Sequence, residues 1–538
     1  MKFKSILKEI SNPIHRRELL ILFFLFAISL LIRSIGLKHG FPLLTRPDEE
    51  LIMDQVFFMS RDGFFYPGNP GTFARPNQIL YSLYYLYLNL MSYLRFGEGY
   101  AARYFFYELH FYHYGRLLIA VMGSLIPVLA YLIGKLIKPG LALAAGLVFM
   151  LFPSYVLHSI FITPDVPITL FTLLVIYFTL RYLVKNETWA LYVATGFAAV
   201  NTAEKYPGLI SLGIVVMGII LQIADMTGES LKAKVLQAFV KLLKVVGVFI
   251  GTLFVVAPKL FINYSLALAG IFLSADSNLP GADHLIFFGR LAFYVRSFGS
   301  WSNLIALIFI VAGCYALLKW RKKPALLLLY GAFYWLLLSA VSLHWERWAL
   351  PMYITPLFLI AVGITFIWDT FSTKPLTRWV ATIVIGLFFA HQLIFSIHTP
   401  IRRSFTDTRL IALEYCNAEG ITQENSLFEG YTPLQDRQRM QMIFEAYQTM
   451  GSEIDYILLS SDMTARYFRE PERFTQEVLI YEEIRNTHRL LARFEPSPEA
   501  IHVWEKVDDI LYFSRQKLTR SALTRYRGPI IEIYKVNR

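Results

Sequence analysis

Apolar runs of about 20 residues recur along the chain from Leu19 to Ile397. A run of this length forms a helix that can cross the hydrocarbon layer of a bilayer, which is about 30 Å thick. Only 17% of the residues are charged, whereas a soluble domain carries roughly 25%. The pattern predicts a polytopic membrane protein, and 538 residues leave room for a further domain.

The net charge of +12 lies mostly in short loops between the apolar runs. By the positive-inside rule such loops are cytoplasmic, so the charge indicates orientation and not nucleic-acid binding. The N-terminus is also basic, and no small-residue cleavage pattern follows the run Leu19 to Ile32. We therefore expect a retained signal-anchor helix. The two cysteines indicate no disulfide framework.

Eleven membrane spans are predicted. After the first, they lie at 116–136, 141–158, 166–184, 188–203, 207–224, 241–258, 301–319, 325–343, 349–369 and 378–397. Residues 77–94 are also apolar, but one crossing there would move every later basic loop outside. Five tyrosines in this segment favour the membrane interface, so residues 38–114 are predicted to be one external loop with amphipathic juxtamembrane helices. A crossing that returns at once through 98–114 would also preserve the orientation.

The predicted fold is therefore a helical transmembrane domain over 1–398 and a small extracytoplasmic α/β domain over 399–538. The C-terminal region is polar, with short apolar runs bounded by turn residues, which is typical of strands alternating with helices. An odd number of spans after a cytoplasmic N-terminus puts this domain outside.

Unusual charges gather at the outer ends of the predicted helices. They are Asp48 and Glu49 in TRPDEE, Arg75 in FARPN, Arg116 in YGRLL, Asp165 in ITPDVP, Lys205 in AEKYP, and His344, Glu346 and Arg347 in HWERW. Charges are costly within hydrocarbon, so such groups usually face a cavity or one another. An acid with several cations suits attack on a phosphate-activated substrate, because the carboxylate takes a hydroxyl proton and the cations neutralise the departing phosphate.

Simpler interpretations exist for each of these charges. A charged side chain at a helix end commonly extends into the lipid headgroups, and an Asp after Pro, such as Asp48, often caps a helix. His110 and His113 lie among tyrosines that indicate an interfacial belt. His158 and Asp165 are too few for a strong metal signal.

From TRPDEELIMDQVFFMSRDGFFYP onward, the sequence resembles the C-type glycosyltransferases related to protein O-mannosyltransferases and lipid A aminoarabinose transferases. The likeness continues through ARPNQILYSL, GRLLIAVMGSLIPVLAYLIGKL, HSIFITPDVPITLF, EKYPGLI and HWERWALPMYITP, in that order, over about residues 18–370. It implies an inverting transferase that takes a monosaccharide from a polyprenyl-phosphate carrier. The acceptor would be a protein, glycan or lipid, reached from the extracytoplasmic side of a membrane, such as the bacterial inner membrane.

The resemblance also implies roles for individual residues. Asp48 matches the proposed catalytic base, with Glu49 as its supporting neighbour and nearest rival. Arg75, Arg116 and Lys205 match positions that bind the lipid phosphate. Asp165 matches a further acid of the family's cavity.

Three positions depart from the family pattern. Glu204 precedes Lys205 where relatives often have Thr, and Trp348 stands in place of a Tyr. Ala74 replaces a glutamate that helps bind zinc in the aminoarabinose transferases, so no catalytic metal or other cofactor is expected.

Two other classes of function compete with the enzyme. A transporter or lipid flippase usually carries ionisable groups near the bilayer midplane and often shows inverted repeats. Here the charges concentrate on one side and no repeat is evident. A non-catalytic assembly or receptor protein is the remaining alternative.

Overall fold

The computed structural model describes residues 13–63, 78–226, 230–262, 264–265, 285–320, 323–341, 344–435, 441–521 and 524–537. The chain divides into two compact units. The first comprises Met1–Ile35, Gln55–Ala275 and Ile286–Ile397, and the second comprises Gly36–Asp54, Asp276–Leu285 and His398–Arg538. Residues 36–54, most of which the sequence places in the first external loop, are thus grouped with the C-terminal region of the chain.

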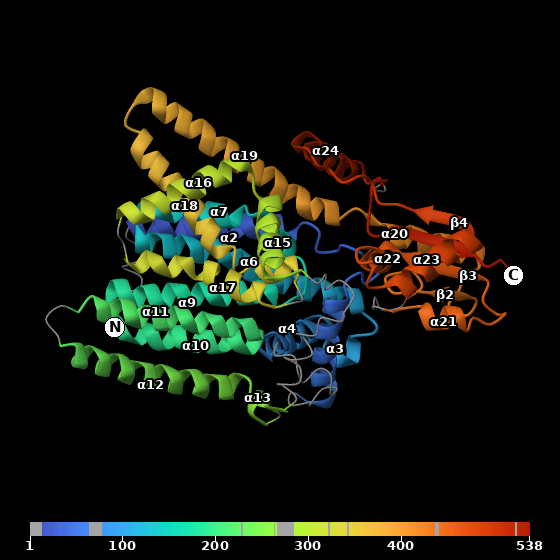
Figure 1. The fold of residues 1–538 in the computed structure, drawn as a ribbon, viewed down its shortest axis with the longest axis horizontal. Helices are drawn as coiled ribbons and strands as arrows, with labels where there is room; N and C mark the ends of the chain where they lie inside the picture. The colour runs from blue at the N-terminus through green and yellow to red at the C-terminus, as the bar shows by residue number, and fades with distance from the viewer. Residues whose placement is uncertain are drawn as a thin grey trace. The chain divides into compact units, whose positions relative to one another are not determined.

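The first unit is a bundle of helices. Its main helices are α2 (Pro13–Ser34), α6 (Glu108–Ile137), α7 (Ala142–Met150), α9 (Asp165–Lys185), α10 (Thr188–Glu204), α11 (Leu212–Ala224), α12 (Leu231–Val256), α16 (Leu304–Trp320), α17 (Tyr330–Ser339), α18 (Ile354–Phe371) and most of α19 (Pro375–Arg403). Helix α9 packs against α6, α10 and α11, and α16 packs along α18 (Figure 1). The core of the bundle is the apolar surface that these helices share.

Small residues allow the closest of these contacts. A side chain at Gly363 of α18 would overlap the backbone oxygen of Phe309, and one at Gly313 of α16 would overlap that of Leu359. Apolar side chains gain little from burial when the alternative is lipid, so membrane helices associate through such close packing. The two glycines explain why α16 and α18 lie so near each other.

Much apolar surface of the bundle remains exposed. Helix α12 buries only Val245 and Phe249, one turn apart, whereas Leu236, Leu243 and Ile250 on its other faces are about half exposed or more. A contiguous apolar surface of this kind marks contact with a membrane or a partner. The lipid-facing sides of the bundle account for it.

Six described helices are long and apolar enough to cross a membrane: α6, α9, Tyr206–Ala224, α12, α18 and α19. The structure has a seventh candidate span if α15 (Phe287–Trp301) and α16 cross the membrane together, although the pair is bent by 113° where the two helices meet. The eleven spans predicted from the sequence are not confirmed. Two predicted spans fall outside this set for different reasons: α10 matches its predicted span but has only 17 residues, and 325–343 divides into η3 (Lys323–Leu329) and α17. Helix α4 (Gln78–Phe96), expected to lie at the interface, falls outside the spanning set.

The second unit contains a mixed sheet with strand order β2-β3-β6-β4. Strands β2 (Ser426–Phe428) and β3 (Tyr456–Ser460) are parallel, whereas β6 (Ile531–Lys535) is antiparallel to both β3 and β4 (Arg489–Phe494). A short parallel pair joins β1 (Thr406–Asp407) to β5 (Tyr526–Arg527).

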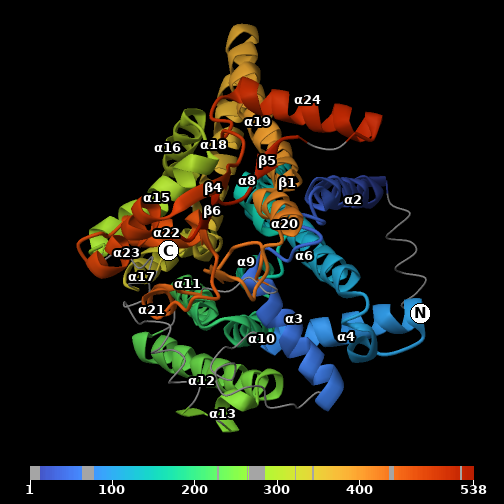
Figure 2. The same cartoon turned by 90° about the vertical axis from the view of Figure 1, so that its right-hand side faces the viewer.

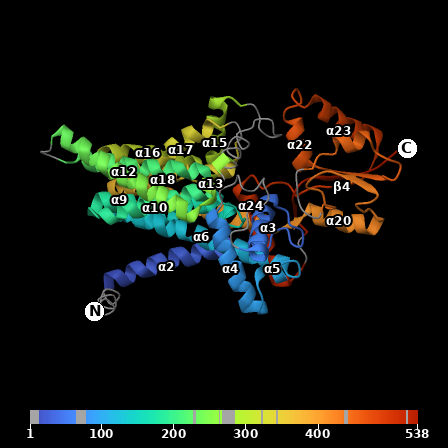
Figure 3. The ribbon, with the colours of Figure 1, turned by 90° about the horizontal axis from the view of Figure 1, so that it is seen from below.

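Helices cover both faces of this sheet. Side chains of a strand point alternately to opposite faces: Ile457 and Leu459 of β3 pack with α22 (Ser461–Phe468) and α23 (Thr475–Thr487). Leu458 packs with α20 (Thr408–Glu419) on the other face. Figure 3 shows α22 and α23 on one side of the sheet and α20 on the other, and Figure 2 gives the view turned by 90°. This layering creates one apolar core on each face of the sheet.

Candidate functional site

Asp165 is the centre of the charged cluster in the first unit. It is the first residue of α9, just after Pro164, and its side chain is 2% exposed. Its Oδ1 accepts a hydrogen bond of 2.8 Å from Lys205 Nζ, and its Oδ2 lies 3.7 Å from Arg347 Nε. The ring of His158 also interacts electrostatically with this carboxylate. A buried carboxylate needs such compensation, so Asp165 organises the groups around it.

Lys205 reaches Asp165 because α10 ends directly before it. Its backbone is extended (φ −158°, ψ 140°), and Pro207 disfavours continuation of the α-helix, so the chain turns into η2 (Tyr206–Ser211). The Lys205 ammonium lies 4.9 Å from the centroid of the Trp348 ring. This indole face adds a cation–π contact. Trp348, a departure from the family pattern, thus helps to hold the lysine beside Asp165.

The HWERW segment divides into two sets of contacts. Arg347, on the short helix η4 (Glu346–Ala349), approaches Asp165. Glu346 instead accepts a hydrogen bond from the indole nitrogen of Trp301. His344 is 5% exposed and packs its ring against the ring of Phe293 at 4.7 Å. The segment thus brings Arg347 to the Asp165 cluster and Glu346 to α15.

Glu204, which precedes Lys205 in the sequence, makes its hydrogen bond to a different helix. It is fully buried, and its Oε2 accepts the backbone N–H of Leu80 at 3.0 Å. Leu80 lies in the first turn of α4, where backbone N–H groups have no partner within the helix. Glu204 therefore caps α4 and ties this helix to the end of α10. Nothing in the spacing of the sequence indicated this link.

Arg116 is a fully buried cation of α6. The hydroxyl of Tyr84 on α4 donates a hydrogen bond of 2.8 Å to the carbonyl of Gly115, the residue before Arg116. The sequence predicts that Arg116 opens its span, whereas α6 begins eight residues earlier, at Glu108, and Arg116 lies in its third turn. Arg75 lies outside the described residues.

Asp48 and Glu49 open α3 (Pro47–Asp62). Glu49 is fully buried and Glu50 is 5% exposed, whereas Asp48 is half-buried. Three acids in the first turn suit the positive end of the helix dipole. These three acids belong to the second unit. Asp165, Lys205 and Arg347 belong to the first unit and contact one another there.

The acids and histidines of the chain also bear on metal binding. Among the described residues, no three His, Cys, Asp or Glu side chains are grouped so that they could hold a metal ion. Independence from metals stays a prediction.

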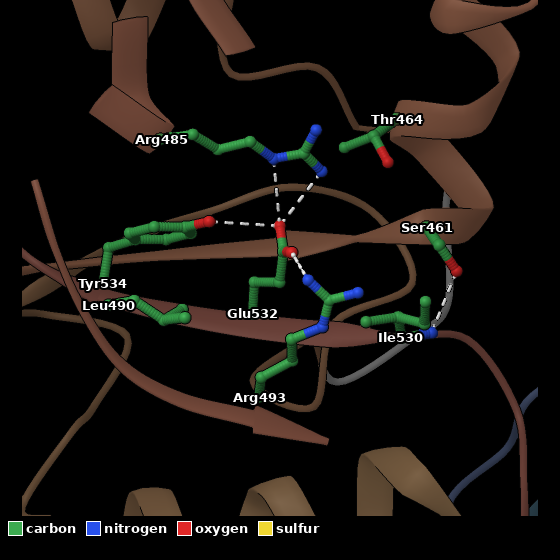
Figure 4. Close-up of a pocket in the computed structure, with 8 residues that line it drawn as sticks. All are labelled: Ser461, Thr464, Arg485, Leu490, Arg493, Ile530, Glu532 and Tyr534. Carbon is green, nitrogen blue, oxygen red and sulfur yellow. Dashed lines mark hydrogen bonds and ion pairs between the residues drawn. The ribbon is translucent and has the colours of Figure 1, made fainter. Parts of the chain in front are cut away.

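A cavity of about 300 Å³ lies in the second unit, between the sheet and its helices (Figure 4). Glu532 of β6 stands at its centre and accepts hydrogen bonds from Arg485 at 3.0 Å and Arg493 at 3.1 Å. The hydroxyl of Tyr534 donates to the same carboxylate at 3.2 Å. Because one carboxylate pairs with both guanidinium groups, we interpret the cluster as a link between β4, β6 and α23.

A family model and two solved structures are similar to the chain. Residues 113–260 match the family model for dolichyl-phosphate-mannose-protein mannosyltransferase. This segment contains Arg116, Asp165 and Lys205, and the match confirms the resemblance to C-type glycosyltransferases. A search of curated proteins found no match.

Two solved structures are also similar to the chain. One is ArnT from Cupriavidus metallidurans bound to undecaprenyl phosphate, with 12% identity and a TM-score of 0.43 over 84% of this chain and 94% of that one. The other is the apo state of the same protein, with 14% identity and a TM-score of 0.46 over 95% and 97%.

Proposed function

We propose that this protein is a C-type glycosyltransferase that moves a monosaccharide from a polyprenyl-phosphate carrier to an acceptor hydroxyl at the extracytoplasmic face of the membrane. The observation that carries the proposal is the contact of the partly exposed cations Lys205 and Arg347 with the buried Asp165, at helix ends of the membrane unit. Lys205, like the buried Arg116, falls within the segment that matches the family model.

The cluster suits recognition of a lipid phosphate. An ammonium group carries three N–H donors, and Asp165 accepts from one of them. Asp165 thereby orients Lys205 and draws Arg347 close, while the indole of Trp348 limits the lysine from a third side. Two cations fixed in this way stabilise negative charge that appears on a departing phosphate. Arg75 and Arg116 complete the phosphate site in this proposal.

The proposed reaction is a single displacement at the anomeric carbon. Asp48 takes the proton of the acceptor hydroxyl, and the acceptor oxygen forms the new bond to that carbon. The bond to the phosphate oxygen breaks on the opposite side, so the configuration inverts. The lipid phosphate leaves with its negative charge against the cations, and Glu49 supports the base.

Turnover by the purified full-length protein tests the function. The protein in nanodiscs is mixed with a polyprenyl-phosphate-linked radiolabelled sugar and a membrane extract as the source of acceptor. We expect release of polyprenyl phosphate together with transfer of label to an acceptor, and loss of both in Asp48→Asn. Movement of the intact donor across the bilayer of sealed proteoliposomes, without cleavage, would show a flippase and overturn the proposal.

A further inference from the structure

Helix α24 (Val503–Thr519) carries an exposed apolar stripe. Trp504, Leu511 and Leu518 are 81%, 51% and 85% exposed. They recur every seven residues, which is about two turns of an α-helix, so they lie in one line along its surface. Ile501, just before the helix, is 75% exposed as well. Large apolar side chains in such a line indicate a binding surface.

The opposite side of α24 is anchored. Asp509 is 5% exposed, lies 2.8 Å from the Nε2 of His398, and accepts a hydrogen bond from Arg525. At about 100° per residue, Asp509 points about 160° away from Leu511 and about 180° away from Leu518. The stripe therefore faces away from the residues that hold the helix.

The anchor lies at the end of a spanning helix. His398 belongs to the last turns of α19, which is long and apolar enough to cross a membrane. The contact between Asp509 and His398 therefore ties α24 to this end of α19. The end of a spanning helix lies at the surface of the bilayer, so α24 is held at that level.

The charges of α24 suit a lipid surface. Its acids already accept hydrogen bonds: Glu505 from the backbone of Ile501 and His502, and Asp508 from Arg525 at 2.6 Å. Arg515 borders the stripe, and Arg520 follows the helix; both are exposed. Cations beside an apolar face favour anionic headgroups, and Trp is enriched at membrane interfaces.

We propose that α24 lies in the headgroup region of the bilayer that α19 crosses. Trp504, Leu511 and Leu518 enter the boundary with the acyl chains, while Arg515 and Arg520 contact anionic lipid phosphates. The C-terminal domain is thereby attached to the lipid surface at two places, by its covalent link to α19 and by α24.

Site-specific labelling of the full-length protein tests this placement. Cysteine is introduced at Leu518, or at Lys517 as the matched control, after exposed Cys314 is replaced by Ala and buried Cys416 is kept. Adjacent residues point about 100° apart, and Lys517 lies over the ring of Phe513, away from the stripe. Each variant carries an environment-sensitive fluorophore in nanodiscs that contain phosphatidylglycerol and a brominated phosphatidylcholine.

We expect the brominated lipid to quench the label at position 518 at least twice as strongly as the label at 517. Adding Leu511→Glu should lower quenching at 518 to the level seen at 517. Equal quenching at the two positions in the parent protein would overturn the proposal. So would a label at 518 that is shielded from aqueous iodide but not quenched by the lipid, because a protein surface would then cover the stripe.

Discussion

Asp165 and Lys205 form the best-defined pair of the candidate site, since their 2.8 Å contact is backed by Arg347 and by the ring of Trp348. In the proposed reaction Asp165 acts through Lys205 and does not touch the acceptor. We expect Lys205→Met to weaken donor binding about tenfold, which corresponds to about 1.4 kcal/mol. Asp165→Asn should add little to this loss in the double variant.

A double-mutant cycle on donor affinity measures this dependence. Each variant is assayed by binding of polyprenyl phosphate to the protein in nanodiscs, with circular dichroism as the control for folding. Losses that simply add would show that Asp165 and Lys205 act independently and would contradict the positioning role.

Arg116 is predicted to bind the lipid phosphate together with Arg75. A guanidinium group stays charged in a partly dry cavity and matches phosphate oxygens with paired donors. Loss of one charge-assisted contact costs roughly 1.5–3 kcal/mol. Arg75→Ala and Arg116→Ala should therefore each weaken donor binding by about one to two orders of magnitude. Unchanged affinity in both variants would return the arginines to structural roles.

Asp48 is the predicted base. Asp48 is half-buried in the first turn of α3, and Asn has nearly the same size, so Asp48→Asn should leave folding and donor binding near normal. Removal of a general base should lower turnover by roughly 10²–10⁴-fold. Glu49→Gln is the matched comparison, because its side chain points about 100° away on the same helix turn. A larger loss in Glu49→Gln than in Asp48→Asn would assign the base to Glu49.

Among the elements, the link between β2 and α23 depends on one buried acid. Glu429 follows β2, is fully buried, and accepts hydrogen bonds from the backbone of Ser460 and the hydroxyl of Tyr481. Burial raises the pKa of Glu429 from 4.5 to about 8. The folded state thus favours the neutral carboxyl, whereas the unfolded chain ionises at lower pH.

The stability that Glu429 contributes is therefore complete below about pH 4.5 and is lost as the pH rises toward about 8. The loss is on the order of a few kcal/mol. Hydrogen exchange of β2 and β3 in the full-length protein, corrected for intrinsic rates, should show protection falling over this range. Glu429→Gln should flatten the profile, and an unchanged profile in this variant would assign the pH dependence to other groups.

For the whole molecule, the basic loops predict that the first external loop and the C-terminal domain share the outer side. Cysteines at the exposed positions Asp62 and Glu424 should react with a membrane-impermeant maleimide in intact cells. A cysteine at exposed Lys374, in a predicted cytoplasmic loop, should react only after permeabilisation. Cytoplasmic labelling at position 62 or 424 would invalidate the predicted orientation.

The sequence alone indicated a membrane protein that resembles the C-type glycosyltransferases. Apolar runs of spanning length are a local property, and the charges at the ends of these runs included Asp165, Lys205 and Arg347 among nine candidate site residues. The number of spans was less predictable, because helix ends and breaks such as that between η3 and α17 depend on packing.

Only the tertiary structure decided which of the helix-end charges meet. All of them had similar spacing from apolar runs, yet Arg347 approaches Asp165, while Glu346 contacts Trp301 and Glu204 caps α4. These choices depend on side-chain direction and on neighbours far away in the chain, which periodicity does not encode. The exposed stripe of α24 is similar: its spacing is visible in the sequence, but the anchored face opposite it follows from the contact between Asp509 and His398.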